Sequence, residues 1–291
     1  MKIVCLFMET EKDVEALVLI CKKNRQLIES IEENPFSSKL FMTVKHQHLY
    51  KPTDPINPDA FSYHVEYPLG YEEAMNIKAK LSQQGQQVFL RKVELNQNDT
   101  KYFNPIPKEV SIFGEKCFSK RVKGRIDIMN NIFSMKDACF FSCYYLESIH
   151  LPKTLTFIGE ECFKFCSSLK KIKMYDAVEY IGKECFCMCT SLQEISLPTS
   201  LTYLPNSCFY RCDTLTKVFI PNGITAVGDG CFNCCNILPE LSLPTSVLSI
   251  GNECFRNCVL LSNLTLPDIK DIGINCFSNC KKLNKSESPL F

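Results

Sequence analysis

Eight Cys-Phe pairs recur along the chain at an almost constant interval, and this regularity constrains the fold more than any other feature. Successive pairs lie 22 or 23 residues apart. Self-similarity at a fixed interval of this length is typical of repeat architectures. One such unit cannot bury its own apolar face, so neighbouring units must stack and share a core. The pairs are Cys117-Phe118, Cys139-Phe140, Cys162-Phe163, Cys185-Phe186, Cys208-Phe209, Cys231-Phe232, Cys254-Phe255 and Cys276-Phe277.

Each unit carries further apolar residues at fixed offsets from the Cys-Phe pair. A second cysteine follows the first by four residues in seven of the units, and a leucine follows that cysteine by three. The Cys, Phe, Cys and Leu spacing predicts one face of a short helical or 3₁₀ segment. An alternating segment such as Ile195-Ser196-Leu197 comes next, with both apolar side chains on one side of an extended backbone. This alternation predicts a short strand with one buried face.

Proline and glycine punctuate the unit. A proline such as Pro198 usually ends the strand, because it withholds an N–H from the ladder. An aliphatic-glycine pair, such as Ile181-Gly182, follows and predicts a sharp turn in which the glycine adopts a positive φ. Leu204-Pro205 is an exception to this pair.

The repeats predict an α/β repeat solenoid over residues 105–283, with a curved parallel sheet on its concave face. Residues 1–104 lack the repeat, and we expect them to form a small α-rich (α+β) capping domain. Residues 284–291 are expected to be a short tail. A cap of this kind covers the core that the first repeat would otherwise expose.

Apolar spacing also predicts the elements of the capping domain. Helices are expected between residues 14 and 31 and over residues 72–83. Prolines at positions 52, 55 and 58 predict a loop. Alternation predicts one strand around Tyr63 and Val65 and a second over residues 88–93.

The unit L-x-x-I-x-L-P-x-x-L-x-x-I-G-x-x-C-F-x-x-C resembles the BspA-like leucine-rich repeat. Members of that family usually carry Ala at the position before Phe, where this chain carries Cys. The resemblance covers about residues 105–283. It implies a leucine-rich repeat solenoid with a concave parallel sheet, and protein binding or adhesion in place of catalysis. The family includes microbial surface proteins and large intracellular protist families, and the intracellular type is the one expected here.

The 19 cysteines could indicate a disulfide framework, metal sites or buried free thiols. The N-terminal segment does not resemble a secretory signal, which favours a reducing compartment. Zinc needs thiolates that converge tetrahedrally, whereas 15 of these cysteines occupy repeat positions that must face the core. Cysteine packs there as a small hydrophobe. We therefore expect free structural thiols, no metal and no cofactor. Cys187 and Cys234 lie between the repeat positions and are expected to be exposed and reactive, whereas Cys5 and Cys21 are expected in the core of the capping domain.

Charge and motifs argue against several classes of function. Lys and Arg number 33 against 32 Asp and Glu, so the chain lacks the positive excess of a nucleic-acid-binding protein. Phosphate-loop, dinucleotide-binding and metalloprotease motifs are absent from the sequence. The four histidines, His46, His48, His64 and His150, are expected at the surface without a catalytic role. The sequence indicates a non-enzymatic cytoplasmic protein, with peripheral association at the plasma membrane as an alternative.

Residues that point away from the core on the predicted strands are the candidate partner-binding residues. Lysines concentrate at the N-terminal half of this concave face, which indicates an acidic protein segment as partner or, less favoured, an anionic membrane surface. Phe219 would be the apolar anchor. The alternative interpretation, weighted equally, is an ordinary solvated face. The candidates are Ser148, His150, Lys171, Lys173, Glu194, Ser196, Lys217, Phe219, Glu240, Ser242, Asn263 and Thr265.

Three further expectations concern assembly and cellular role. An uncapped last repeat would expose a strand edge and an apolar ladder, so we expect a homo-oligomer through the last two repeats. A helical module ahead of repeats resembles the layout of F-box proteins, which makes a ubiquitin-ligase substrate adaptor an alternative function. A surface adhesin is the third alternative.

Overall fold

The computed structural model describes residues 46–99, 105–128 and 131–283. The chain divides into two compact units, one of residues 1–94 with 109–111 and the other of residues 95–108 with 112–291. The helices expected between residues 14 and 31, together with Cys5 and Cys21, lie outside the described residues.

The described part of the first unit combines short parallel strands with one helix. Strands β1 (His46–Leu49), β2 (Ser62–Val65) and β4 (Gln87–Leu90) pair in parallel in that order. Strand β3 (Leu69–Gly70) pairs in parallel with β5 (Val93–Leu95), and helix α4 spans Tyr71–Gln83. The predicted helix and the strand around Tyr63 and Val65 are confirmed, whereas the single strand predicted over residues 88–93 is two strands, β4 and β5, with different partners. Tyr63 and Val65 are buried in the small core of this unit.

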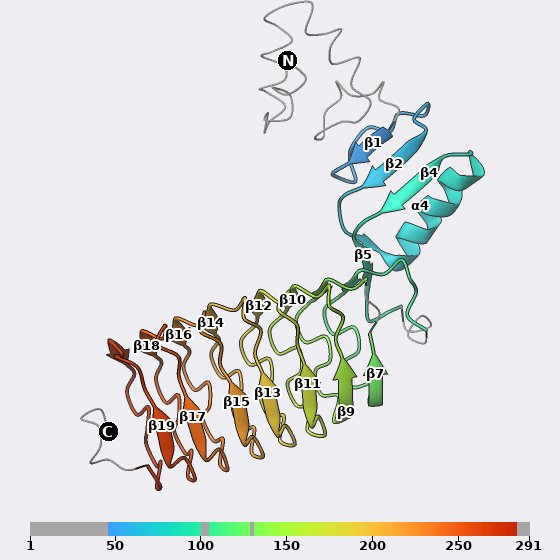
Figure 1. Ribbon diagram of the computed structural model, residues 1–291. Coiled ribbons are helices and arrows are strands. Elements are labelled where there is room, and N and C mark those ends of the chain that lie inside the picture. The colour runs from blue at the N-terminus through green and yellow to red at the C-terminus, as the bar shows by residue number, and fades with distance from the viewer. Residues whose placement is uncertain (1–45, 100–104, 129–130, 284–291) are drawn as a thin grey trace, which may run out of the picture. The chain divides into compact units, whose positions relative to one another are not determined.

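The second unit is a solenoid in which each repeat contributes one longer and one shorter strand. Within each ladder, successive strands lie side by side and run parallel (Figure 1). The longer strands are β7 (Lys123–Asp127), β9 (Tyr145–His150), β11 (Lys171–Lys173), β13 (Glu194–Ser196), β15 (Lys217–Phe219), β17 (Glu240–Ser242) and β19 (Asn263–Thr265). The shorter strands are β6 (Ile112–Phe113), β8 (Ser134–Met135), β10 (Phe157–Ile158), β12 (Tyr180–Ile181), β14 (Tyr203–Leu204), β16 (Ala226–Val227), β18 (Ser249–Ile250) and β20 (Asp271–Ile272). The predicted parallel-strand solenoid is therefore confirmed.

The residues around each Cys-Phe pair form turns, and the expectation of a short helical segment there was wrong. The residue before each cysteine position has a left-handed backbone, as at Glu184 (φ 56) and Met188 (φ 59). Residues adopt this conformation singly, so it interrupts a helix. The N–H of Phe186 donates to the carbonyl of Cys208 in the next unit, with N and O 2.9 Å apart. Hydrogen bonds between units therefore determine the local conformation.

Phenylalanine and cysteine side chains connect the units inside the solenoid. The rings of the eight Cys-Phe pairs stack in sequence, with centroids 5.0 to 5.6 Å apart. The second cysteine donates its thiol to the phenylalanine carbonyl of the preceding unit, as Cys212 Sγ does to Phe186 O at 3.2 Å. All 15 repeat-position cysteines are buried, as predicted. The thiol is thus a core group that also serves as a hydrogen-bond donor, which an alanine could not do.

The recurring glycine is required by close approach of the coils, and the expectation of a positive φ at this position was wrong. A Cβ added to Gly182 would lie 2.5 Å from the Cα of Glu160 in the preceding unit. The N–H of Gly182 donates to the carbonyl of Ile158 at 2.9 Å. The glycines that do have a positive φ are Gly85, Gly124 and Gly230, none of which belongs to an aliphatic-glycine pair. The pair therefore marks the place where two backbones come into contact.

Pro205 interrupts the ladder of shorter strands. At the same position of the next unit, the N–H of Gly228 donates to the carbonyl of Leu204 at 2.8 Å. Proline has no N–H, so position 205 cannot make the equivalent bond to the unit before it. Strand pairing stops between β12 and β14. The exception noted in the sequence thus coincides with a break in the sheet.

Pro239 interrupts the ladder of longer strands in the same way. The N–H of Ser262 donates to the carbonyl of Pro239 at 2.9 Å, and the N–H of Thr216 donates to the carbonyl of Gln193 at 2.9 Å. Pro239 cannot continue this series toward Thr216, because it has no donor. Strand pairing stops between β15 and β17, which we call the β15–β17 seam.

Candidate functional site

The exposed residues of the longer strands form two parallel rows, which we call the strand stripe. On each strand they flank a central apolar residue, such as Ile172 or Ile195, that packs into the core. Strand register aligns the rows, since Lys171 pairs with Ser148 on one side and Glu194 on the other. The structure brings all twelve predicted residues together on this surface. Ser148 is half-buried and the other eleven are exposed: His150, Lys171, Lys173, Glu194, Ser196, Lys217, Phe219, Glu240, Ser242, Asn263 and Thr265.

The strand stripe begins one strand earlier than the sequence analysis placed it. Strand β7 pairs with β9, which aligns Arg125 with Ser148 and Asp127 with His150. His150 Nδ1 lies 2.5 Å from Asp127 Oδ1, and Arg125 Nη2 lies 2.9 Å from the same nitrogen. The hydrogen bond from His150 is the main cause that lowers the pKa of Asp127. The alternation of Arg125-Ile126-Asp127 was the available signal, although the first unit lacks the second cysteine that would have aligned it.

The positive charge expected on the stripe is partly neutralised within it. Lys171 Nζ lies 2.8 Å from Glu194 Oε1 on the next strand. Lys173 lies over the ring of Tyr175, with its ammonium nitrogen 5.3 Å from the ring centroid. The stripe therefore presents a mixed charge pattern together with Phe219, whose side chain is 60% exposed as the anchor role requires.

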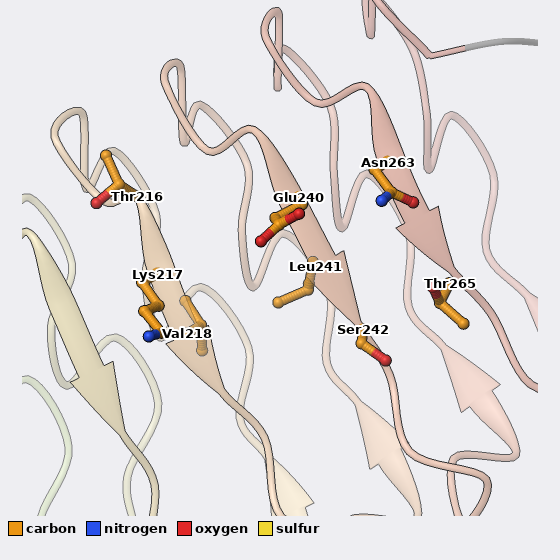
Figure 2. A pocket seen from close by; sticks show the side chains of 8 residues that line it. All are labelled: Thr216, Lys217, Val218, Glu240, Leu241, Ser242, Asn263 and Thr265. Atoms are coloured by element: carbon orange, nitrogen blue, oxygen red, sulfur yellow. The ribbon is translucent and has the colours of Figure 1, made fainter.

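A hollow of about 260 Å³ lies on the strand stripe across the β15–β17 seam and extends to β19 (Figure 2). Short side chains leave room above strands β17 and β19, where Ser242, Asn263 and Thr265 line the hollow. Lys217 and Glu240 come from the two strands on either side of the seam. Five of the predicted candidates thus share one concavity. Repeat spacing did not predict this grouping, because it treats every pair of neighbouring strands alike.

The cysteines supply no chemical site among the residues that the structure describes. The 17 cysteines there are free, and no group of three or more His, Cys, Asp or Glu side chains there could hold a metal ion. Cys187 is 4% exposed, so the expectation that it is accessible was wrong. Burial, with a contribution from Glu184, raises its pKa to about 11. Cys234 is partly exposed, and Asn257 Nδ2 donates to its sulfur at 3.3 Å.

Three of the four histidines lie together in the first unit. The rings of His48 and His64 stack with centroids 4.6 Å apart, and Phe89 stacks on His64 at the same distance. His46 Nδ1 lies 2.9 Å from Ser62 Oγ. All three rings are partly exposed at the surface of the unit, as expected, and those of His48 and His64 belong to an aromatic stack.

The described helix does not resemble a membrane span. Within residues 46–99, 105–128 and 131–283, no helix has the length and apolarity needed to cross a bilayer.

Comparisons with known proteins agree with the repeat. The model of the family described as BspA type leucine rich repeat region matches in six copies over residues 73–180, 96–213 and 158–284. A leucine-rich repeat protein of Treponema pallidum has a similar structure, with 27% identity and a TM-score of 0.55, covering 57% of this chain and 81% of that one. A leucine-rich cell surface protein of Faecalibacterium prausnitzii matches with 15% identity and a TM-score of 0.43, covering 88% and 76%. No curated protein matches the sequence. Because the family model covers more than half of the 291 residues, the chain belongs to the family of BspA-type leucine-rich repeat proteins.

Proposed function

We propose that this protein is a non-enzymatic scaffold that binds a partner protein through the strand stripe. The observation that carries the proposal is the pair of exposed rows in strand register, which offers polar, charged and aromatic side chains on one rigid surface. Proteins of this family are generally interaction scaffolds, and a repeat scaffold sets shape while its outward residues set specificity. Phe219 is the apolar anchor of the surface, because large exposed aromatic side chains often dominate interface energy.

Site-specific photo-crosslinking in the native cell tests this proposal. A photoreactive phenylalanine at Phe219 should capture a protein partner. The same amino acid at Tyr180, an aromatic residue on the shorter-strand ladder that is 44% exposed, is the matched control and should capture less. In a pull-down without crosslinking, the double variant Lys173→Glu with Phe219→Ala should lose the partner without a lower melting temperature, since both side chains are exposed. Equal capture at the two positions would remove the strand stripe from consideration.

The proposal includes a cytoplasmic location for the chain. The free cysteines support it, because cytosolic thiols are kept reduced. Fractionation with thiol labelling before lysis is the test. Recovery of the chain in an exported fraction, with its cysteines oxidised, would contradict this part of the proposal.

We also propose self-association through the last repeats. Among the described residues, β19 and β20 each pair with a strand on one side only. An open strand edge can pair with a second copy. Light scattering after size-exclusion chromatography should show a mass above that of one chain, whereas a strict monomer at high concentration would refute it.

A further inference from the structure

Two lysine-glutamate pairs on neighbouring strands differ in one respect. Lys171 and Glu194 are strand-register partners, and their charged atoms lie 2.8 Å apart. Lys217 on β15 and Glu240 on β17 occupy the same repeat positions, two repeats further along the chain. No ion pair joins Lys217 to Glu240 in the described part of the chain. The difference coincides with the β15–β17 seam, where Pro239 ends the backbone ladder.

Lys217 has a second glutamate, Glu194, as its register partner on the other side of its strand. Glu194 has a lowered pKa, first because of its hydrogen bond with Lys171 and also because of the charge of Lys217. Glu240 has Asn263 as its register partner on β19, and that side chain carries no charge. Glu240 is therefore the last charged residue of this row, and its carboxylate lacks an ion-pair partner in the described residues and faces the hollow (Figure 2).

The hollow is lined by one carboxylate, one ammonium group and several hydroxyl and amide groups that can accept hydrogen bonds. Glu240 supplies a carboxylate, and Ser242, Thr265 and Asn263 supply hydroxyl and amide oxygens. Lys217 is the charged donor of the lining and stands at one wall. The volume of about 260 Å³ is below the roughly 300–1,000 Å³ of pockets that enclose drug-sized ligands. This suits a single long side chain better than a whole small molecule.

We propose that the hollow receives an arginine side chain from an extended segment of the partner protein, with an acidic residue of the same segment beside Lys217. A guanidinium carries five donors in a planar fork and pairs with a carboxylate through two parallel hydrogen bonds. Glu240 would accept that fork, and the neighbouring hydroxyl and amide oxygens would accept the remaining donors. The inference rests on the proposed function and changes its expected partner, because an arginine-containing segment replaces a purely acidic one.

A phage-displayed library of random linear peptides, selected on the full chain, provides the test. Selected peptides should be enriched in Arg over Lys at one position, with Asp or Glu within two residues of it. A synthetic copy of a selected peptide should bind Glu240→Gln about 10- to 100-fold more weakly, which is the loss expected for a charge-assisted hydrogen bond. Glu179→Gln is the matched control, since that exposed carboxylate lies outside the strand stripe, and the affinity of the peptide for this variant should change by less than about threefold.

Replacing the peptide arginine with citrulline completes a double-mutant cycle. Citrulline keeps the shape but removes the charge, so the peptide should then bind the native chain and Glu240→Gln equally. Equal affinity of the arginine peptide for native chain and Glu240→Gln would overturn the inference, as would a selection that yields acidic peptides without arginine or no peptide at all. Photo-crosslinking at Phe219 is independent of these results, so the strand stripe could still bind a partner after the arginine inference had failed.

Discussion

Raising the pH should unfold the solenoid between about pH 9 and 10, because its core contains thiols that cannot ionise while they remain buried. Burial is the main cause that raises the pKa of twelve described cysteines, and eight of them are counted here: Cys187, Cys166, Cys189, Cys208, Cys212, Cys231, Cys235 and Cys258. In the unfolded chain a cysteine ionises near pH 8.5. Below that value both states hold the proton, so the thiols contribute no pH dependence. Above it the unfolded state loses protons that the folded state retains, and stability falls as the pH rises.

The size of the effect follows from the number of thiols. Each buried thiol costs the folded state about 0.8 kcal/mol at pH 9 and about 1.4 kcal/mol at pH 9.5. The eight thiols together then cost about 7 kcal/mol at pH 9 and about 11 kcal/mol at pH 9.5. Domains are stable by roughly 5–15 kcal/mol in total. The pH dependence of these thiols is therefore large enough to unfold the chain in this range.

Circular dichroism during a titration from pH 7 to pH 10, with reductant present throughout, is the appropriate assay. A cooperative loss of signal is expected, with recovery on return to pH 7. Cys212→Ala is the control variant, because removing one buried thiol should reduce the slope of stability against pH by about 1.2 kcal/mol per pH unit between pH 9 and pH 9.5. A stability that stays constant from pH 7 to pH 10 would falsify the reasoning, since it would mean that these thiols are not buried and protonated.

Three further outcomes are expected. Gly182→Ala should destabilise the chain by about 2–4 kcal/mol in urea denaturation, because the added Cβ would force the coils apart. Pro205→Ala, at the same repeat position, is the control and should cost less than about 1 kcal/mol. Equal losses of stability in the two variants would contradict the close-approach argument. Iodoacetamide at pH 8 should modify Cys234 well before Cys187, as read by peptide mass spectrometry, and the reverse order would show that Cys187 is accessible. Pro239→Ser restores a backbone N–H at the β15–β17 seam, so hydrogen exchange should show a protected amide at position 239, and an unprotected amide there would mean that something other than the missing donor holds the seam open.

Part of this structure could be predicted from the sequence because the solenoid repeats the same environment in every unit. A residue at a given repeat position has the same neighbours above and below it, so periodicity alone identified the 15 core cysteines and the outward residues of the stripe. The helix over residues 72–83 was predictable for a similar reason, since its apolar spacing and acidic first turn are local signals. The function of the stripe was not predictable to the same depth, because partner chemistry depends on how side chains of different units combine.

The sequence by itself determined the repeat, its register and which side chains face inward, since all three follow from spacing along the chain. Only the tertiary structure decided the backbone conformation of the turns and the contacts between neighbouring units, because spacing along the chain does not specify them. Turns replaced the expected helical segments because hydrogen bonds between units hold residues such as Glu184 and Met188 in the left-handed conformation. Glycine proved necessary for contact between coils, Cys187 proved buried, and strand pairing proved to stop at Pro239, between the strands of Lys217 and Glu240. Each of these depends on which atoms of the neighbouring unit lie opposite a residue, and that proximity exists only once the coils have stacked.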